Sequence, residues 1–230
     1  MRRLGLALVL LLFVAACAQG QTGDFVLPRA VSQSLDHRTA ASLSLNSGAT
    51  TIDVHAADLA DKLYRVATPD TSGVVPRGTM TGNAAQLRLV PSNEPGSGAE
   101  VDLRLTTKVA WNLRIAGGAK TESLDLRGAK LSGLQVVAGV GQLEIWLPAP
   151  TGPTTIELSG GASGVRLHVP EGVLTQVTAA DGAGSVTVDG VVDSGVDTGA
   201  VWTPEGWTEQ QKHYDVRLLT GVGWLTLDRS

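Results

Sequence analysis

The 230-residue sequence has a single cysteine, Cys17, so an internal disulfide cannot form. Basic residues are also scarce, since 18 Lys and Arg stand against 22 Asp and Glu and give a formal net charge of −4. A protein that binds the phosphate backbone of nucleic acid carries a basic stripe, so this balance argues against a nucleic-acid partner. Aromatic residues make up only 4% of the chain, whereas glycine occurs 28 times. This composition suits short strands joined by tight turns.

Long apolar runs are missing except near the N-terminus. Residues 4–15 form an apolar run of about twelve residues that follows the positively charged Arg2 and Arg3. Such a run is too short to span a bilayer comfortably and is typical of a signal peptide. It ends in Val-Ala-Ala-Cys at Cys17, which resembles the lipobox of bacterial lipoproteins. An ordinary secretory signal that is cut near Ala18 is the alternative.

The lipobox resemblance implies cleavage before Cys17 and attachment of diacylglycerol to its sulfur. Two or three acyl chains anchor a protein stably, whereas one chain does not. We therefore expect residues 1–16 to be a lipoprotein signal peptide, residues 17–29 a polar tether and residues 30–230 the folded domain. The protein would then be lipid-anchored and extracytoplasmic, at the cell membrane or the outer membrane.

The folded domain contains a recurring pattern in which small residues near glycine precede two apolar residues spaced two apart. The first apolar positions of successive copies are separated by 19, 22, 21 and 39 residues. A period near twenty with strand-like alternation indicates stacked coils of β-structure. The sequence thus predicts an all-β fold, a single-stranded β-solenoid over residues 30–230. The first apolar positions are Leu124, Leu143, Val165, Val186 and Leu225.

Alternation within each copy predicts which side chains enter the core. Leu143, Ile145, Val165 and Leu167 are expected to point inward, and glycine near each turn is expected to supply a positive φ. Residues 58–64 fit either a turn of helix or a return strand, and the strand is favoured because the following residues are β-prone. Residues 69–77 and 91–98 are expected to be loops.

The 39-residue step arises because residues 191–211 interrupt the period. Residues 216–227 resume the pattern and are expected to form the terminal coil of the stack. A terminal coil exposes its apolar face and needs a cap. The expected cap consists of Trp202, Trp207 and Trp224.

The order of glycines, aliphatics and prolines is clearest in Trp111-Asn-Leu113-Arg-Ile115, Leu124-Asp-Leu126, Val137-Ala-Gly139-Val-Gly141, Leu147-Pro148, Val169-Pro170-Glu171-Gly172 and Gly182-Ala-Gly184-Ser-Val186. These segments resemble the toastrack domain, which occurs at the C-terminal end of LiaF-like cell-wall-stress proteins and in proteins classed as candidate adhesins. The resemblance runs from about Leu43 to Asp228. It implies a single-stranded β-solenoid, an envelope location and no known catalytic residues. Many relatives have transmembrane helices where this chain has the expected lipid anchor.

Motifs for metal, nucleotide or hydrolase chemistry are missing. The glycine pairs lack the aspartates of calcium-binding repeats, and no Gly-x-Ser-x-Gly elbow occurs. The histidines have no pair at metal-ligand spacing, and they are His37, His55, His168 and His213. We therefore expect no enzyme activity, no cofactor and no metal site.

Outward-facing residues of adjacent coils provide the candidate site. Trp146 points outward by alternation, and its ring could stack on a sugar. A mixed-charge group could align on the same face, where a carbohydrate-active enzyme would place its acid and base; its members are Asp125, Arg127, Glu144, Arg166 and His168. A solvated sheet face is the simpler interpretation. The candidate glycan or partner surface is Trp146, Arg166 and His168.

The sequence therefore predicts a non-enzymatic cell-envelope lipoprotein that acts as an interaction or adhesion module, with a link to envelope stress left open. Its expected partners are the membrane, through the N-terminal lipid anchor, and an envelope protein or cell-wall glycan. A direct glycan-binding adhesin and a carbohydrate-active enzyme on the same solenoid are the alternatives.

Overall fold

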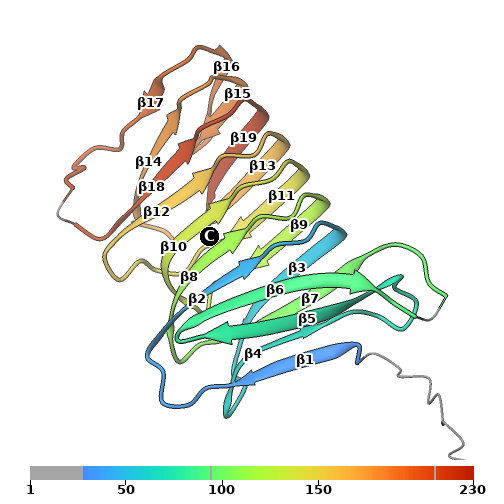
Figure 1. Ribbon diagram of the computed structural model, residues 1–230. Coiled ribbons are helices and arrows are strands. Elements are labelled where there is room, and N and C mark those ends of the chain that lie inside the picture. Colours follow the sequence, from blue (N-terminus) through green and yellow to red (C-terminus); the bar gives the residue numbers. More distant parts are fainter. Residues whose placement is uncertain (1–27, 94, 210) are drawn as a thin grey trace, which may run out of the picture.

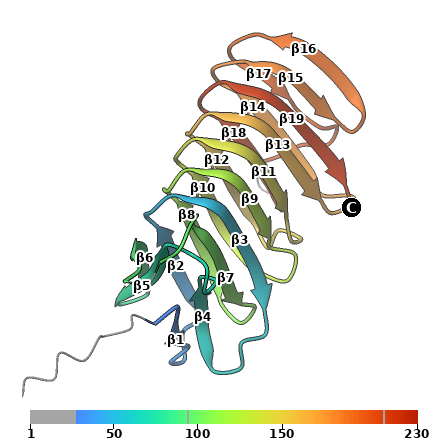
Figure 2. The same cartoon turned by 90° about the vertical axis from the view of Figure 1, so that its right-hand side faces the viewer.

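Two long β-sheets face each other and form a solenoid (Figures 1 and 2). The computed structural model describes residues 28–93, 95–209 and 211–230. All regular elements within these ranges are strands, 19 in number, which confirms the predicted all-β solenoid. No helix able to cross a membrane occurs in this part of the chain. The expected signal peptide, Cys17 and almost all of the expected tether lie outside the described residues.

Ten strands form sheet A and nine form sheet B. In spatial order, sheet A contains β1 (Ala30–Ser34), β4 (Lys62–Ala67), β7 (Glu100–Thr106), β3 (Ala49–Ala57), β9 (Ala119–Asp125), β11 (Val140–Trp146), β13 (Ala162–Val169), β19 (Val222–Arg229), β15 (Ala183–Val188) and β16 (Val191–Val196). Sheet B contains β17 (Ala200–Trp202), β14 (Leu174–Ala179), β18 (His213–Leu218), β12 (Pro153–Leu158), β10 (Lys130–Val136), β8 (Ala110–Ile115), β2 (Ala40–Leu45), β6 (Ala84–Pro91) and β5 (Val74–Thr81). A coil gives one strand to each sheet, as β10 and β11 do, and successive coils pair in parallel.

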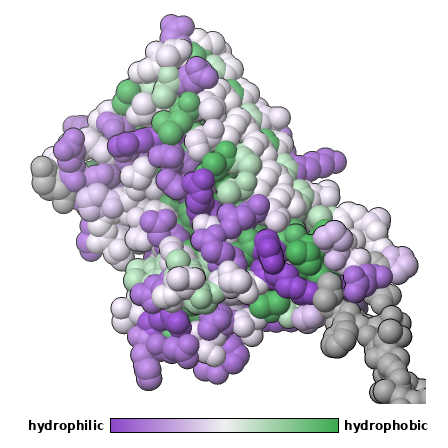
Figure 3. All heavy atoms as spheres, in the orientation of Figure 1, coloured by the Kyte–Doolittle hydropathy of each residue, from purple (hydrophilic) through white to green (hydrophobic). Residues whose placement is uncertain are grey.

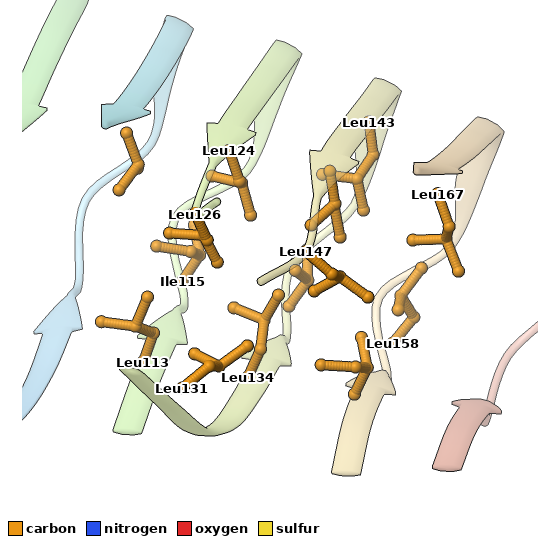
Figure 4. Close-up of a cluster of buried hydrophobic side chains, with 14 of the residues drawn as sticks. Leu113, Ile115, Leu124, Leu126, Leu131, Leu134, Leu143, Leu147, Leu158 and Leu167 are labelled. Atoms are coloured by element: carbon orange, nitrogen blue, oxygen red, sulfur yellow. The ribbon is translucent and has the colours of Figure 1, made fainter. Parts of the chain in front are cut away.

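Columns of aliphatic side chains fill the space between the two sheets (Figure 4). Leu143 lies beside Val165, and Ile145 lies beside Leu167, in parallel register. All four are at most 2% exposed, whereas Arg166 between them is exposed. The predicted alternation is confirmed for these positions. Each coil buries its apolar column against its neighbours, which is how repeat proteins gain stability.

Corner glycines that lead from sheet B to sheet A allow neighbouring coils to approach closely. A Cβ on Gly117 would overlap the backbone of Ser47, and one on Gly160 would overlap the backbone of Ala138. Neither glycine has a positive φ, so the expectation that corner glycines supply a positive φ is wrong here. The narrow spacing between stacked backbones is what excludes a side chain at these positions.

The order of coils in space differs from their order in the sequence at both ends. The first coil, β2–β3, lies between the β6–β7 coil and the β8–β9 coil. The last coil, β18–β19, lies between the β12–β13 coil and the β14–β15 coil. The expectation that residues 216–227 form the terminal coil is therefore wrong. Alternation is the same in every coil, so it does not specify a coil's neighbours.

The end of the solenoid that follows β14 and β15 is closed by the segment that interrupts the repeat. Within it, β16 pairs with β15 and β17 pairs with β14, both antiparallel. Trp202 packs against the core at this end, as expected of a cap. Trp224 instead lies on β19 inside sheet A, and Trp207 packs on His213 with ring centroids 4.2 Å apart. Two of the three expected cap residues thus have other positions.

The opposite end is closed by β1, β4 and β5, which also pair antiparallel with their neighbours. A turn followed by β4 confirms the strand interpretation of residues 58–64. The predicted loop at residues 69–77 is wrong from Val74 onward, because β5 begins there and contains Pro76. Since β5 is the edge strand of sheet B, a residue without an N–H donor is tolerated in it.

Candidate functional site

The predicted surface residues lie in two neighbouring rows on the outer face of sheet A. Parallel register places Glu144 beside Arg166, and it places Trp146 between Asp125 and His168. Equivalent outward positions of successive coils stack in this way because the strands pair without a shift. The structure therefore brings Trp146, Arg166 and His168 together on β11 and β13.

The Trp146 ring stacks on the His168 ring, with centroids 4.9 Å apart and an angle of 11° between the planes. His168 Nε2 lies 2.8 Å from Glu144 Oε1, so the imidazole is held from two sides. The His168 side chain is only 17% exposed. Because the imidazole covers one face of the indole, less of Trp146 is free for a sugar ring than alternation alone indicates.

Trp224 adds a second indole to this face. From the sequence, this residue was expected to be part of the cap. It lies beside Gly164 in the register of β13 and β19. A Cβ on Gly164 would overlap the six-membered part of the indole and would also lie 2.8 Å from Gln142 Oε1. The indole therefore occupies the space above Gly164 that a side chain would fill. Arg166 Cζ lies 6.0 Å from the Trp224 ring centroid, at the outer limit of a cation–π contact.

A shallow hollow of about 190 Å³ lies on the same face. Pockets that enclose a small-molecule ligand have volumes of about 300–1,000 Å³, so this hollow is too small to enclose one. Its lining combines polar and apolar groups, which suits contact with a partner that lies across the sheet. The lining residues used below are Gln142, Glu144, Arg166 and Trp224.

Asp125 and Arg127 form an ion pair beside Trp146. Arg127 Nε donates a hydrogen bond of 2.9 Å to Asp125 Oδ1, and Nη2 donates one of 2.6 Å to Oδ2. These hydrogen bonds lower the pKa of Asp125, so this carboxyl stays ionised and is a poor proton donor. Glu144 is bound to His168. Neither carboxylate of the carbohydrate-active alternative is therefore held as a free general acid.

The histidines stay apart in the fold as they do in the sequence. His55 faces outward on β3 beside Asp125, whereas His213 is buried at the start of β18. Within the described ranges, no group of three or more His, Cys, Asp or Glu side chains could hold a metal ion.

Glu122 is a buried carboxyl that the sequence analysis missed. It is 0% exposed and lies between Ile52 and Leu143 in the register, so its side chain occupies an inward position. No described residue hydrogen-bonds to either of its carboxyl oxygens. Burial raises the pKa of Glu122 to about 8, so the group is protonated at neutral pH. The sequence did contain a signal for its inward position, because Glu122 precedes Leu124 by two positions and therefore lies on the same side of the strand.

Comparison with known proteins identifies a family and a fold. The family described as the N-terminal domain of toast_rack, DUF2154, matches residues 29–152, which is more than half of the chain. A search of curated proteins found no match. The solved structure of a proposed cell adhesion protein from Clostridium sporogenes ATCC 15579 matches with a TM-score of 0.64 and 16% identity, over 89% of this chain and 100% of that chain. At this identity the likeness shows the fold alone.

A second solved structure, of a proposed adhesin from Bacteroides fragilis NCTC 9343, covers 87% of this chain and 97% of that chain. Its identity is 10% and its TM-score is 0.27, which is too low to support an argument.

Proposed function

Because the chain belongs to the family of the toast_rack N-terminal domain, we propose that it is a non-enzymatic interaction or adhesion module of the cell envelope. The Clostridium sporogenes protein that shares the fold is itself a proposed cell adhesion protein. Proteins of one fold often differ in function, so the site has to support the proposal as well.

The observation that carries the proposal is the fixed, open face of sheet A. Trp146, His168 and Glu144 hold one another in place, and Trp224 lies beside Arg166 over a strand that has glycine at position 164. Rigid aromatic and arginine side chains on an open surface are typical of sites that bind another macromolecule. Glycoside hydrolysis would instead require a carboxyl group that can donate a proton, and Arg127 keeps Asp125 ionised.

The proposed location is the extracytoplasmic side of the envelope, with the chain held through acylated Cys17. Residue 28 adjoins β1, so the chain enters the solenoid at the end that contains β1 and β5 (Figure 1). An anchored protein would therefore present β16 and β17 away from the membrane (Figure 2). The face of sheet A runs between these ends and would be accessible along its length. A more specific version of this proposal is that the protein takes part in sensing envelope stress.

Cross-linking in intact cells tests the interaction module. Arg166→Ala removes an exposed arginine from the outer face of sheet A, and Arg114→Ala removes one from the outer face of sheet B, which is the matched control. We expect one envelope protein to be captured repeatedly by the wild type, less by Arg166→Ala, and undiminished by Arg114→Ala. Equal capture by both variants, or capture of nothing above background, would contradict the proposal.

Direct glycan binding is the second candidate, and the position of Trp224 favours it. An indole that lies across a β-sheet can stack on a sugar ring, and Arg166 beside it can bind hydroxyl or carboxylate groups. Retention on purified cell-wall glycan should then fall for Trp224→Ala and fall less for Trp146→Ala, whose indole is partly covered by His168. Unchanged retention of both variants would remove this candidate.

A further inference from the structure

The end of the solenoid farthest from residue 28 presents a free strand edge. β16 pairs only with β15, and the spatial order of sheet A ends with β16. Its row of unpaired backbone groups can accept another strand. Figure 2 shows β16 at this end of the molecule, beside β15 and β17.

The register identifies the free backbone groups. Val188 and Val191 flank the two-residue turn Asp189-Gly190, both of which have positive φ. Residues that flank such a turn form a hydrogen-bonded pair, and the next residue directs its N–H and C=O the other way. Val192 therefore directs its N–H and C=O toward the free edge.

Three valines at this end of the solenoid are unusually exposed. Val191 is 68% exposed, Val192 is 62% exposed, and Val201 on the edge strand of sheet B is 52% exposed. Asp193 Oδ2 accepts a hydrogen bond of 2.6 Å from Trp202 Nε1, so its carboxylate is turned toward the capped interior. In the view of Figure 3, hydrophobic residues appear near the upper end of a mostly mixed surface.

At the other end of the solenoid, the edge of sheet B is protected against strand addition. Its sheet B edge, β5, contains Pro76, which has no N–H donor, followed by Arg77. Proline and charged residues are the usual means of blocking an edge. By contrast, β16 contains neither proline nor lysine nor arginine. The β5 edge is therefore blocked. The sheet A edge at that end, β1, also lacks proline and charge, so the exposed valines and the acidic groups described next are what distinguish β16.

Charge indicates what kind of strand the β16 edge would accept. Residues 171–230 contain nine acidic and three basic residues, whereas residues 28–110 contain eight of each. Asp197 directly follows β16. Asp181 lies two residues before Ala183, which pairs with Val196, and a Cβ on the intervening Gly182 would lie 2.7 Å from the Val196 carbonyl oxygen. Asp189 at the other end of the β15–β16 hairpin is bound by Arg229. The free acidic groups thus gather at the Val196 end of β16.

We propose that β16 is the docking edge for an extended, basic segment of a partner protein, which adds as a further strand to sheet A. The backbone of the segment pairs with Val192, its small apolar side chains cover the exposed valines, and its lysines or arginines reach Asp181 and Asp197. A second copy of this chain is disfavoured, because two acidic edges would repel each other and the opposite end has no net positive charge. This site is separate from the outer face of sheet A.

Peptide binding to the full chain, purified in detergent micelles, tests the proposal. The probe is a ten-residue peptide that alternates threonine or valine with lysine, and the control peptide has glutamate in place of lysine. We expect the lysine peptide to bind at least tenfold more tightly than the glutamate peptide and to slow hydrogen exchange of the Val192 amide. Higher salt should weaken binding. Equal affinities, or no change at the Val192 amide, would overturn the proposal.

Variants locate the peptide on the edge. Val192→Pro removes the free N–H, and Val192→Lys adds a repelling charge in case the proline variant does not fold. Either change should reduce affinity for the lysine peptide at least tenfold. Leu219→Lys is the matched control, since Leu219 is 42% exposed and lies outside β16. Loss of affinity in the control as well, or concentration-dependent dimers that Val192→Lys abolishes, would assign the edge to another occupant.

Discussion

In the middle of the solenoid, from β8 to β13, every strand has a parallel neighbour on both sides, whereas both ends finish in antiparallel strands. The middle coils are nearly uniform, with aliphatic columns inside and polar rows outside. The ends are built from irregular segments that interrupt the repeat. The middle is therefore stabilised by the same packing in every coil. The ends rely on individual contacts, such as the hydrogen bond from Trp202 to Asp193.

The largest expected effect is a charge placed in a middle column. Leu167→Asp should lower the free energy of unfolding by about 4 kcal/mol, because the new carboxylate would be buried without a partner. Arg166→Asp, one position away and exposed, should change it by about 0.5 kcal/mol or less. Urea denaturation measures both. Similar losses in the two variants would show that inward and outward positions are not distinguished.

The second effect concerns the exception to the apolar middle, Glu122. The folded protein holds its proton up to about pH 8, whereas the unfolded chain releases it near the ordinary value of 4.5. Stability should therefore be highest below this window and fall by about 1.4 kcal/mol per pH unit within it. Glu122→Gln keeps the shape and removes the titration.

We expect the difference in unfolding free energy between Glu122→Gln and wild type to increase by roughly 3 kcal/mol in favour of the variant from pH 5 to pH 7. Using the difference matters because Asp125, whose pKa is lowered by Arg127, changes stability in the opposite direction. Parallel pH profiles of the two proteins would rule out a neutral, buried Glu122.

A smaller effect distinguishes the two uses of glycine. Gly160→Ala should cost about 2 kcal/mol, because the new Cβ would overlap the backbone of Ala138 in the stacked coil. Gly199→Ala, at the β16–β17 turn, has open space but a φ of +82°, so it should cost about 1 kcal/mol. Thermal unfolding of both variants measures which loses more stability. A greater loss of stability for Gly199→Ala than for Gly160→Ala would contradict the prediction.

The smallest effect is expected at the exposed end. Asp189→Asn removes the partner of Arg229 Nε, which lies 2.7 Å from Asp189 Oδ1. The pair is partly exposed, so the loss should be about 0.5 kcal/mol. Hydrogen exchange should increase in β15 and β16 and stay constant in β11. A uniform increase along the chain would mean that the end does not open separately from the middle.

The sequence was most informative where the repeat is regular. Alternation at Leu143–Leu167 predicted the inward columns and the all-β solenoid, because burial and strand period are local properties. Glu122 follows the same alternation, but its polar type hid its inward position. Trp224 could not be placed on sheet A from its own strand, since its position depends on Gly164, which is 60 residues away in the sequence. Coil order at the ends depends on long-range pairing and left no local signal.

The last coil of the chain is held between two others, and this has a mechanical consequence. β19 ends at Arg229 and has parallel partners on both sides, β13 and β15. In a solenoid whose final coil is also outermost, pulling on that end can break the backbone hydrogen bonds between strands one after another. Tension applied at Ser230 must instead shear β19 past two strands at once. Many backbone hydrogen bonds between strands then share the force before any of them breaks. We therefore expect the force needed to unfold this chain from its C-terminus to be higher than for a solenoid whose final coil is outermost.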